Sequence, residues 1–272
     1  MMKKYILFIG VVLAFASCSN NGNNENDNGN GGATANIAPP SMQYSIVNVY
    51  PHDTAAFTEG LLIHDGQLYE STGGQAQISD FKSWFGPVDM KTGKAVKKIM
   101  LDTSYFGEGI NIFNGNLYQL TWQNHKGFVY DAKTYKKLRE FTYAGEGWAL
   151  TNDGKYLIMS DGSSNLQYLD PESLKVIKIL GVQDNSGPVG NINELEYING
   201  FIYANQYLTS YILKIDPSSG KVVGRLDFDS LNNQVKIKFP NAQEMNGIAY
   251  DSAAGKIYIT GKAWPNLYEV KF

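Results

Sequence analysis

Cysteine and histidine are scarce in this sequence, which holds one cysteine and three histidines among 272 residues. A single cysteine excludes a disulfide within the chain, so the fold must rest on its apolar core. His52, His64 and His125 show no metal-ligand spacing, and the last two fall at or near expected turns. Neither a Gly-rich phosphate loop before a helix nor a serine nucleophile elbow is present. Metal chemistry therefore has little support in the sequence, and the signatures of phosphate-loop and serine-hydrolase chemistry are absent from it.

The sequence also lacks a basic stripe and long amphipathic helical patterns. It holds 23 basic and 26 acidic side chains, and loss of Lys3 and Lys4 with a cleaved leader leaves 21 against 26, a net charge of −5. This mild acidity argues against nucleic-acid binding. Tyrosine is the leading aromatic residue, with 18 copies. Turn signals of Gly, Asn and Asp recur about every ten residues, which favours an all-β domain.

Residues 1–17 have the pattern of an export signal. Two lysines precede an apolar run, Tyr5 to Ala16, that is too short to span a bilayer. The tetrapeptide Phe15-Ala-Ser-Cys18 resembles the lipobox of bacterial lipoproteins, which predicts a lipid anchor on Cys18. A plain secretory peptide cut near Ser17 is the alternative. We expect an exported bacterial lipoprotein, periplasmic or on the cell surface, tethered to a membrane.

Residues 18–40 are expected to form a disordered tether behind the lipid-anchor cysteine. The run 19–32 is almost wholly Asn and Gly, so it has no side chain whose burial would offset the entropy of ordering the chain. Residues 41–272 then remain for folding. About 230 residues suit one closed β domain.

Five segments of this domain share a frame in which two apolar strands flank a tight turn. The clearest copy runs over 106–122 and turns at Asn114-Gly115, a strong hairpin signal. The last copy has two extra residues in its turn. The other four copies begin at Phe57, Gly147, Asn193 and Asn246.

Each of the first four copies is followed by a third strand ending in Asp, a turn and a fourth strand. The expected fourth strands are 95–101, 137–143, 176–181 and 222–228. Four strands every 40 to 50 residues are typical of a propeller blade. The fifth copy has no fourth strand, whereas 43–50 alternates without a partner. We predict an all-β, five-bladed β-propeller whose last blade is closed by the N-terminal strand, which removes open sheet edges.

Alignment of the copies places two rings of side chains at one mouth of the central channel, because the first strand begins where the second ends. The first ring holds Glu59, Glu108, Gly147, Asn193 and Asn246. The second holds Gly73, Trp122, Asp161, Tyr207 and Lys262. Taken one at a time, these residues are better explained as solvated glutamates or interblade tryptophans. Their variety at equivalent positions nevertheless favours a binding or catalytic pocket.

Several motifs around these positions resemble the plant and bacterial glutamine cyclotransferases, also called glutaminyl cyclases. The resemblance covers about 44–272 and is carried by Phe-Gly-Glu-Gly at 106–109, Leu-Tyr-Gln-Leu-Thr-Trp at 117–122, Asn-Glu-Leu-Glu-Tyr-Ile-Asn-Gly at 193–200 and Thr-Gly-Lys-Ala-Trp-Pro-Asn-Leu-Tyr-Glu-Val at 260–270. It implies a five-bladed propeller that converts the N-terminal glutamine of peptides to pyroglutamate and releases ammonia. It implies no cofactor and none of the catalytic zinc of the animal enzymes, within the acyltransferase class.

The resemblance also implies roles for single residues. It assigns Glu108 as the catalytic carboxylate, with Asn193 and Lys262 as donors to the developing oxyanion. One carboxylate between the amine and the leaving nitrogen can carry the proton, so we assign the proton shuttle to Glu108. The pocket aromatics are Phe57, Trp122 and Trp148.

Two positions depart from the family pattern, which has Gln at position 59 and Trp at position 207. Tyr207 keeps an aromatic face. Glu59 adds a negative charge that could favour the substrate's ammonium group or alter the substrate range. Both residues are expected to contact the substrate.

A rival hypothesis keeps the fold without the chemistry. A cell-surface propeller could bind a peptide or glycan on Trp122, Trp148 and Tyr207 and would not need Glu108. A purely structural scaffold is the third possibility. For the enzyme we expect peptide or protein substrates with N-terminal Gln, no nucleic acid, membrane contact only through the lipid anchor, and a monomer.

Overall fold

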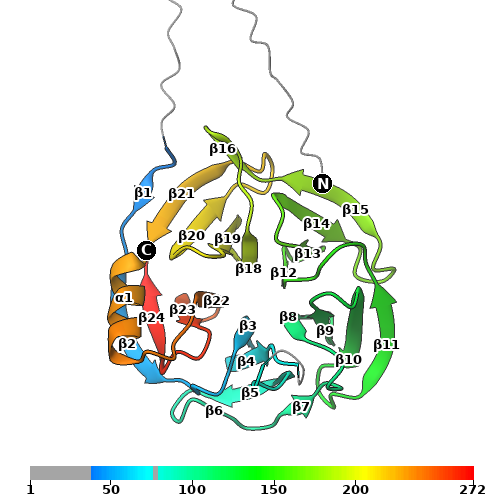
Figure 1. Ribbon diagram of the computed structural model, residues 1–272. Helices are drawn as coiled ribbons and strands as arrows, with labels where there is room; N and C mark the ends of the chain where they lie inside the picture. Colours follow the sequence, from blue (N-terminus) through cyan, green and yellow to red (C-terminus); the bar gives the residue numbers. More distant parts are fainter. Residues whose placement is uncertain (1–37, 76–78) are drawn as a thin grey trace, which may run out of the picture. The chain divides into compact units, whose positions relative to one another are not determined.

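The structure, a computed structural model, describes residues 38–75 and 79–272. Within this part of the chain, five antiparallel blade sheets surround a central axis (Figure 1). The predicted five-bladed β-propeller is therefore confirmed. The export signal, Cys18 and most of the tether lie outside the described residues.

Each blade begins with an innermost strand and continues outward (Figure 1). The first strands are β3 (Thr58–His64), β8 (Gly107–Phe113), β12 (Ala149–Asn152), β18 (Ile192–Ile198) and β22 (Met245–Asp251). The second strands are β4 (Gln67–Thr72), β9 (Asn116–Thr121), β13 (Leu157–Ser160), β19 (Phe201–Gln206) and β23 (Lys256–Gly261). The third strands are β5 (Trp84–Asp89), β10 (Lys126–Asp131), β14 (Asn165–Leu169), β20 (Tyr211–Ile215) and β24 (Asn266–Lys271).

The turns between the first two strands show why the repeat signal was so clear. At Asn114-Gly115 the two φ angles are 51° and 75°. At Asp65-Gly66 they are 50° and 75°. Positive φ at both central residues defines the type I′ turn, whose twist matches the flanking strands.

Three fourth strands lie where the sequence predicts them, namely β11 (Lys137–Thr142), β15 (Val176–Gly181) and β21 (Val222–Asp227). The predicted strand 95–101 is instead broken into β6 (Lys94–Ala95) and β7 (Ile99–Met100), which both pair with β5. Pro87 of β5 accepts a hydrogen bond from Val96 N–H but has no N–H to return. The ladder is interrupted at that point. A short hairpin of β16 (Gln183–Asp184) and β17 (Gly187–Pro188) leads from the third blade to the fourth.

The N-terminal strand closes the ring as predicted. Strand β2 (Ser45–Pro51) pairs antiparallel with β24 and supplies the last blade's outer strand. Ahead of it, β1 (Ser41–Met42) pairs parallel with β21 of the neighbouring blade. The N-terminal segment therefore joins the edges of two blades.

His52 fixes the chain immediately after β2. Its Nδ1 lies 2.7 Å from the Trp264 carbonyl oxygen, and its Nε2 lies 3.0 Å from Glu70 Oε1. Burial lowers the pKa of His52, but the Glu70 carboxylate outweighs it and the net pKa is raised. This histidine is a structural latch between the last blade and the first.

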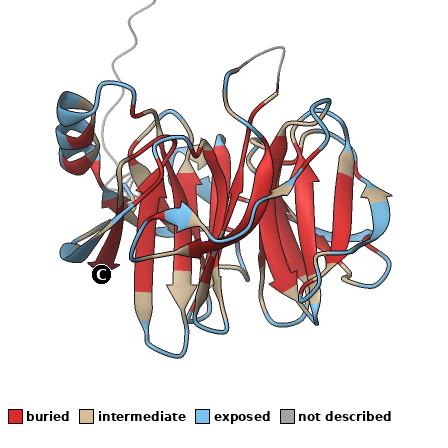
Figure 2. Ribbon diagram, turned by 90° about the horizontal axis from the view of Figure 1, so that it is seen from below, coloured by how far each residue is buried: buried red, intermediate tan, exposed pale blue. Residues whose placement is uncertain are grey.

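The apolar core lies between blades rather than within one. Five clusters of buried side chains occupy the five blade junctions, and each mixes residues from two neighbouring sheets. Figure 2 shows the buried residues along the strands, whereas the loops and helix α1 (Asp229–Lys238) are largely exposed, as are the outer strands β2, β11 and β15. Every blade is consequently stabilised by both of its neighbours.

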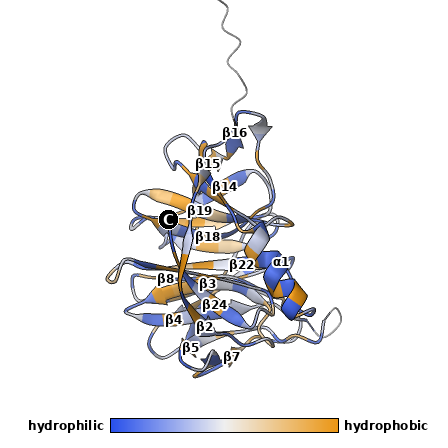
Figure 3. Ribbon diagram, turned by 90° about the vertical axis from the view of Figure 1, so that its left-hand side faces the viewer, coloured by the Kyte–Doolittle hydropathy of each residue, from blue (hydrophilic) through white to orange (hydrophobic). Residues whose placement is uncertain are grey.

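One helix, α1 (Asp229–Lys238), was not anticipated from the sequence. Its Leu231 and Val235 pack into the cluster between the fourth and fifth blades, while the rest of its surface is largely hydrophilic (Figure 3). Its ten residues are too few for a clear helical period, since 229–238 holds only three apolar positions. In the described part of the chain, no helix has the length and apolarity needed to cross a membrane.

Candidate active site

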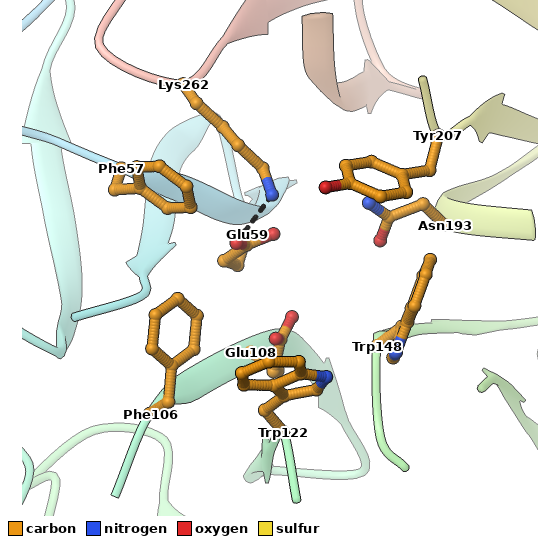
Figure 4. Close-up of a pocket in the computed structure, with 9 residues that line it drawn as sticks. All are labelled: Phe57, Glu59, Phe106, Glu108, Trp122, Trp148, Asn193, Tyr207 and Lys262. Carbon is orange, nitrogen blue, oxygen red and sulfur yellow. Dashed lines mark hydrogen bonds and ion pairs between the residues drawn. The ribbon is translucent and has the colours of Figure 1, made fainter. Parts of the chain in front are cut away.

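A small pocket opens at the mouth of the channel where the first strands begin and the second strands end (Figure 4). Its volume is about 190 Å³, whereas typical small-molecule sites measure about 300–1,000 Å³. That size suits a single terminal residue. Every blade contributes to the lining, which consists of Phe57, Glu59, Phe106, Glu108, Trp122, Trp148, Asn193, Tyr207 and Lys262.

The structure brings together all eight residues that the sequence placed in a site in this domain. Of the other ring positions, Gly73, Gly147 and Asp161 do not line the pocket. Asn246 lies behind it, and its amide donates a hydrogen bond of 3.1 Å to Glu59 Oε2. Phe106 was missed as a lining residue. The repeat contained the signal, since Phe106 precedes Glu108 by two residues as Phe57 precedes Glu59.

Glu59 and Lys262 form a buried ion pair in the pocket. Lys262 Nζ lies 2.7 Å from Glu59 Oε1 (dashed in Figure 4). Burial and the charge of Glu244 raise the pKa of Glu59 to about 6, against the opposing effect of Lys262. Burial lowers the pKa of Lys262, but the charges of Glu59 and Glu108 outweigh it and hold that pKa above its usual value. Lys262 therefore remains a cation at neutral pH.

The ammonium group of Lys262 also faces two aromatic rings. It lies 4.6 Å from the ring centroid of Phe57 and 5.5 Å from that of Tyr207. Cation–π contact with the negative faces of the rings stabilises a desolvated charge. The cation is thus fixed at one side of the pocket by an anion and two rings.

Glu108 is the second carboxylate of the pocket, and its surroundings differ from those of Glu59. Its side chain points into the cavity in Figure 4, is 5% exposed, and accepts no hydrogen bond from the side chains or backbone of the described residues. Burial, the charge of Glu59 and that of Glu146 raise its pKa well above the usual range, opposed by Lys262. A raised pKa makes the ionised carboxylate a stronger base, so Glu108 is suited to take up a proton and return it.

Asn193 supplies an amide with free hydrogen-bonding capacity. It stands on β18 and is 3% exposed, and none of the described residues forms a hydrogen bond with its Oδ1. An unpartnered buried polar group costs about 1–3 kcal/mol. Such a group is explained when a bound ligand supplies the missing partner.

Two glycines leave room for the aromatic walls. A Cβ at Gly73 would lie 2.1 Å from the Phe106 ring, and one at Gly162 would lie 2.5 Å from the Trp148 ring. Gly162 also has a φ of 78°, a conformation that favours glycine. These positions have no chemical role of their own, but they allow the rings to stand where they do.

Two more buried carboxylates lie in the channel outside this pocket. Glu194 accepts the Leu61 and Ile248 backbone N–H groups at 3.0 and 2.8 Å. Glu196 accepts the Tyr250 N–H at 2.8 Å and the Thr151 hydroxyl at 3.4 Å. Both cross-link blades. Glu108 differs from them because its carboxylate has no such structural bond.

Metal ligands do not gather in the described part of the chain. Across 38–75 and 79–272, no group of three or more His, Cys, Asp or Glu side chains could hold a metal ion. His64 precedes the Asp65-Gly66 turn, and His125 is exposed and itself has a φ of 55°. His52 forms the latch described above. The ionisable and amide groups that line the pocket are two carboxylates, one ammonium, one phenol and one amide.

Comparison with known proteins places this arrangement in a family. The sequence matches the glutamine cyclotransferase family over residues 11–272. It is 36% identical over 243 residues to a glutaminyl-peptide cyclotransferase of Arabidopsis thaliana, covering 88% of this chain and 74% of that protein. The crystal structure of Myxococcus xanthus glutaminyl cyclase superposes with a TM-score of 0.79 at 36% identity, covering 86% of this chain and 97% of the other. The chain belongs to the glutamine cyclotransferase family.

Proposed function

We propose that this protein is a glutaminyl-peptide cyclotransferase, which converts the N-terminal glutamine of peptides to pyroglutamate and releases ammonia. The observation that carries the proposal is the buried Glu108 carboxylate, which faces a one-residue pocket without a structural hydrogen bond. Family membership and the names of two relatives support the same activity.

The chemistry requires the α-amine to attack the side-chain amide of the same residue. Ring closure is intramolecular, so the pocket must mainly fold the side chain back and exclude water. The aromatic walls supply this slot. The amine is nucleophilic only when neutral, and the ionised Glu108 carboxylate takes its surplus proton.

Attack of the amine nitrogen on Cδ forms the new C–N bond and moves negative charge to the amide oxygen. Lys262 and the Asn193 amide provide donors for that charge. Protonated Glu108 then gives its proton to the amide nitrogen. The Cδ–N bond breaks and ammonia leaves. The ring nitrogen, which still carries two hydrogens, gives one of them to the Glu108 carboxylate. The departing ammonia takes that proton as ammonium, so Glu108 is again a carboxylate and the protons balance.

We propose further that the reaction belongs to the acyltransferase class and runs without zinc. The donors just named already cover the two tasks that a zinc ion would perform, namely polarising the amide oxygen and stabilising its charge. Dialysis against a chelator tests this proposal directly. Unchanged turnover after chelation supports it, and turnover that is lost and restored by added zinc contradicts it.

The activity is tested by incubating the domain with a glutamine-led peptide and measuring loss of ammonia by mass spectrometry. Glu108→Gln should lower kcat by about 10²- to 10⁴-fold with little change in substrate binding, because it removes the base and keeps the shape. Glu59→Gln should lower it less, since Glu59 is already held by Lys262 and Asn246. Glu140→Gln, on the outer strand β11, is the surface control.

A binding module predicts the opposite order. Trp122→Ala would then have the largest effect, on affinity, and Glu108→Gln would be nearly silent. Wild-type protein that binds the peptide without releasing ammonia would exclude the enzyme and leave the binding module.

We propose that the protein is an exported lipoprotein that acts as a monomer. The basic start, the apolar run and Ala16-Ser17-Cys18 support lipid attachment at Cys18. Metabolic labelling with a fatty acid should mark the wild type and not Cys18→Ala. A wild-type protein that never takes up the label would remove the lipid anchor.

A further inference from the structure

Glu146 lies just outside the pocket and binds two of its walls. It belongs to the segment between β11 and β12 and is half-buried. Its Oε2 accepts the Trp122 Nε1–H at 2.7 Å and the Trp148 Nε1–H at 2.8 Å. Its Oε1 accepts a hydrogen bond of 3.0 Å from Gln123. One anion therefore holds indoles from two different blades.

The Glu146 carboxylate is suited to this task because it stays ionised. Burial acts to raise its pKa, but the hydrogen bonds from Gln123, Trp148 and Trp122 outweigh burial and the net pKa is lowered. Hydrogen bonds to an ionised acceptor are stronger than those between neutral groups. The two indoles are consequently held more firmly than by packing alone.

Contacts around the pocket close into a circuit of seven side chains. In order, they are Phe57, Phe106, Trp122, Glu146, Trp148, Tyr207 and Lys262, from which the circuit returns to Phe57.

The circuit consists mainly of rings that contact edge to face. The three ring pairs have centroid distances of 6.1, 5.7 and 5.5 Å. Two gaps remain between rings, and a charged side chain fills each of them. Lys262 joins Phe57 to Tyr207 on one side, and Glu146 joins Trp122 to Trp148 on the other. Lys262 reaches into the cavity, whereas Glu146 acts from behind the walls.

We propose that Glu146 is a positioning residue for the cyclisation, an inference that rests on the function proposed above. By holding both indoles it sets the width of the slot in which the terminal glutamine folds back on itself. Loss of the anion would leave two indole N–H groups without their acceptor and free the rings to turn. A wider slot binds the side chain less well and presents the amide to the amine less often.

The test compares Glu146→Leu with the conservative Glu146→Gln. The leucine variant should raise KM and lower kcat/KM by about 10- to 100-fold, the size expected for loss of hydrogen bonds to a charged group. The glutamine variant keeps an amide oxygen that can accept both indole N–H groups, so it should recover most of the activity. Glu140→Leu is the matched control. It lies on β11, and its ion pairs among the described residues are with the surface lysines Lys126 and Lys137.

A purely structural role would behave differently. Partial unfolding would lower the apparent kcat with KM unchanged, and the glutamine variant would give no selective recovery. If Glu146→Leu does not fold, a cycle with Trp148→Phe and Glu146→Asp still tests the clamp, because aspartate keeps the charge but withdraws the carboxylate from the indoles by one methylene. The phenylalanine removes one of the N–H groups that Glu146 binds, so the two changes together should cost less than their sum. Additive effects would refute the clamp.

Failure of the clamp and failure of the proposed function can be distinguished. If the wild type cyclises the peptide and Glu146→Leu leaves KM unchanged, only the clamp is wrong. If the wild type binds the peptide but releases no ammonia, the proposed function is wrong. The clamp is then judged from peptide affinity by tryptophan fluorescence, and equal Kd values for Glu146→Leu and wild type would refute it. Absence of any binding by the wild type would overturn both.

Discussion

Glu196 offers a measurable test of the buried carboxylates beneath the pocket. It stands on β18, at the centre of the ring, and binds strands of both neighbouring blades through the Tyr250 N–H and the Thr151 hydroxyl. Burial raises its pKa from the usual 4.5 to about 8, against the lowering effect of those hydrogen bonds. The folded protein therefore keeps this group protonated at neutral pH, whereas the unfolded chain releases the proton.

The sign and size of the effect follow from linkage. Below pH 4.5 the group is protonated in both states and its stabilisation is fully present. As pH rises, only the unfolded state gains by ionising, so stability falls until the folded protein also ionises near pH 8. At about 1.4 kcal/mol for each pKa unit, the loss is about 3 kcal/mol at pH 7 and about 5 kcal/mol above pH 8.

Glu196→Gln should remove this dependence. Its amide oxygen can accept the Tyr250 N–H, and its amide N–H can donate to the Thr151 hydroxyl. We expect the variant to match the wild type within about 1 kcal/mol at pH 5 and to exceed it by about 4 kcal/mol at pH 8. Glu196→Gln also removes a charge that contributes to raising the pKa of Glu194. This second effect likewise favours the stability of the variant at high pH.

Urea unfolding followed by tryptophan fluorescence provides the assay, since Trp84 and Trp264 are buried in the folded protein. Glu172→Gln, at an exposed turn, is the control and should leave the pH dependence intact. A Glu196→Gln variant less stable than the wild type at pH 8 would refute the reasoning. It would mean that the carboxylate is ionised there and stabilises the fold as an acceptor.

Two further predictions concern the pocket and the ring. Lys262→Met should lower kcat by about 10²- to 10³-fold, since it removes a donor aimed at the oxyanion; steady-state kinetics measure this, and an unaltered kcat would exclude the cation from the mechanism. Deletion of 41–51 removes β1 and β2 and should give aggregated or unfolded protein by circular dichroism and size-exclusion chromatography, because β24 loses its partner and becomes an open edge. Deletion of 19–38 should leave a soluble domain, and equal behaviour of the two deletions would contradict the closure role of β2.

Much of this architecture could be predicted from the sequence because the frame is repeated. A turn such as Asn114-Gly115 fixes the register of its hairpin, and alignment of the turns fixes which side chains share a mouth. The pairing of β2 with β24 could be predicted by elimination, because the last blade lacked a fourth strand and the N-terminal strand had no partner of its own. These inferences needed no knowledge of contacts between distant residues.

The remaining features depend on such contacts. The break between β6 and β7 depends on Pro87, whose missing N–H matters only when its strand partner is known. Helix α1 is held by the cluster between two blades rather than by its own weak pattern. The roles of Glu146 and of the Glu59–Lys262 pair could not be found by aligning repeats, because each joins side chains from different blades. Gly73 and Asp161 occupied ring positions in the alignment but point to no chemistry, since a ring position fixes the backbone and not the direction of a side chain.

The distribution of the pocket over all five blades has a consequence for how the protein is made. Side chains from Phe57 to Lys262 must meet, and β24 must receive β2, before the cavity exists. The ribosome synthesises these segments in order. An incomplete chain therefore contains Glu108 and Trp122 but not yet Lys262, the cation of the same pocket. We therefore expect the nascent protein to be inactive until its last blade has been synthesised and paired with β2. Activity should then appear together with ring closure, because the pocket needs side chains from all five blades.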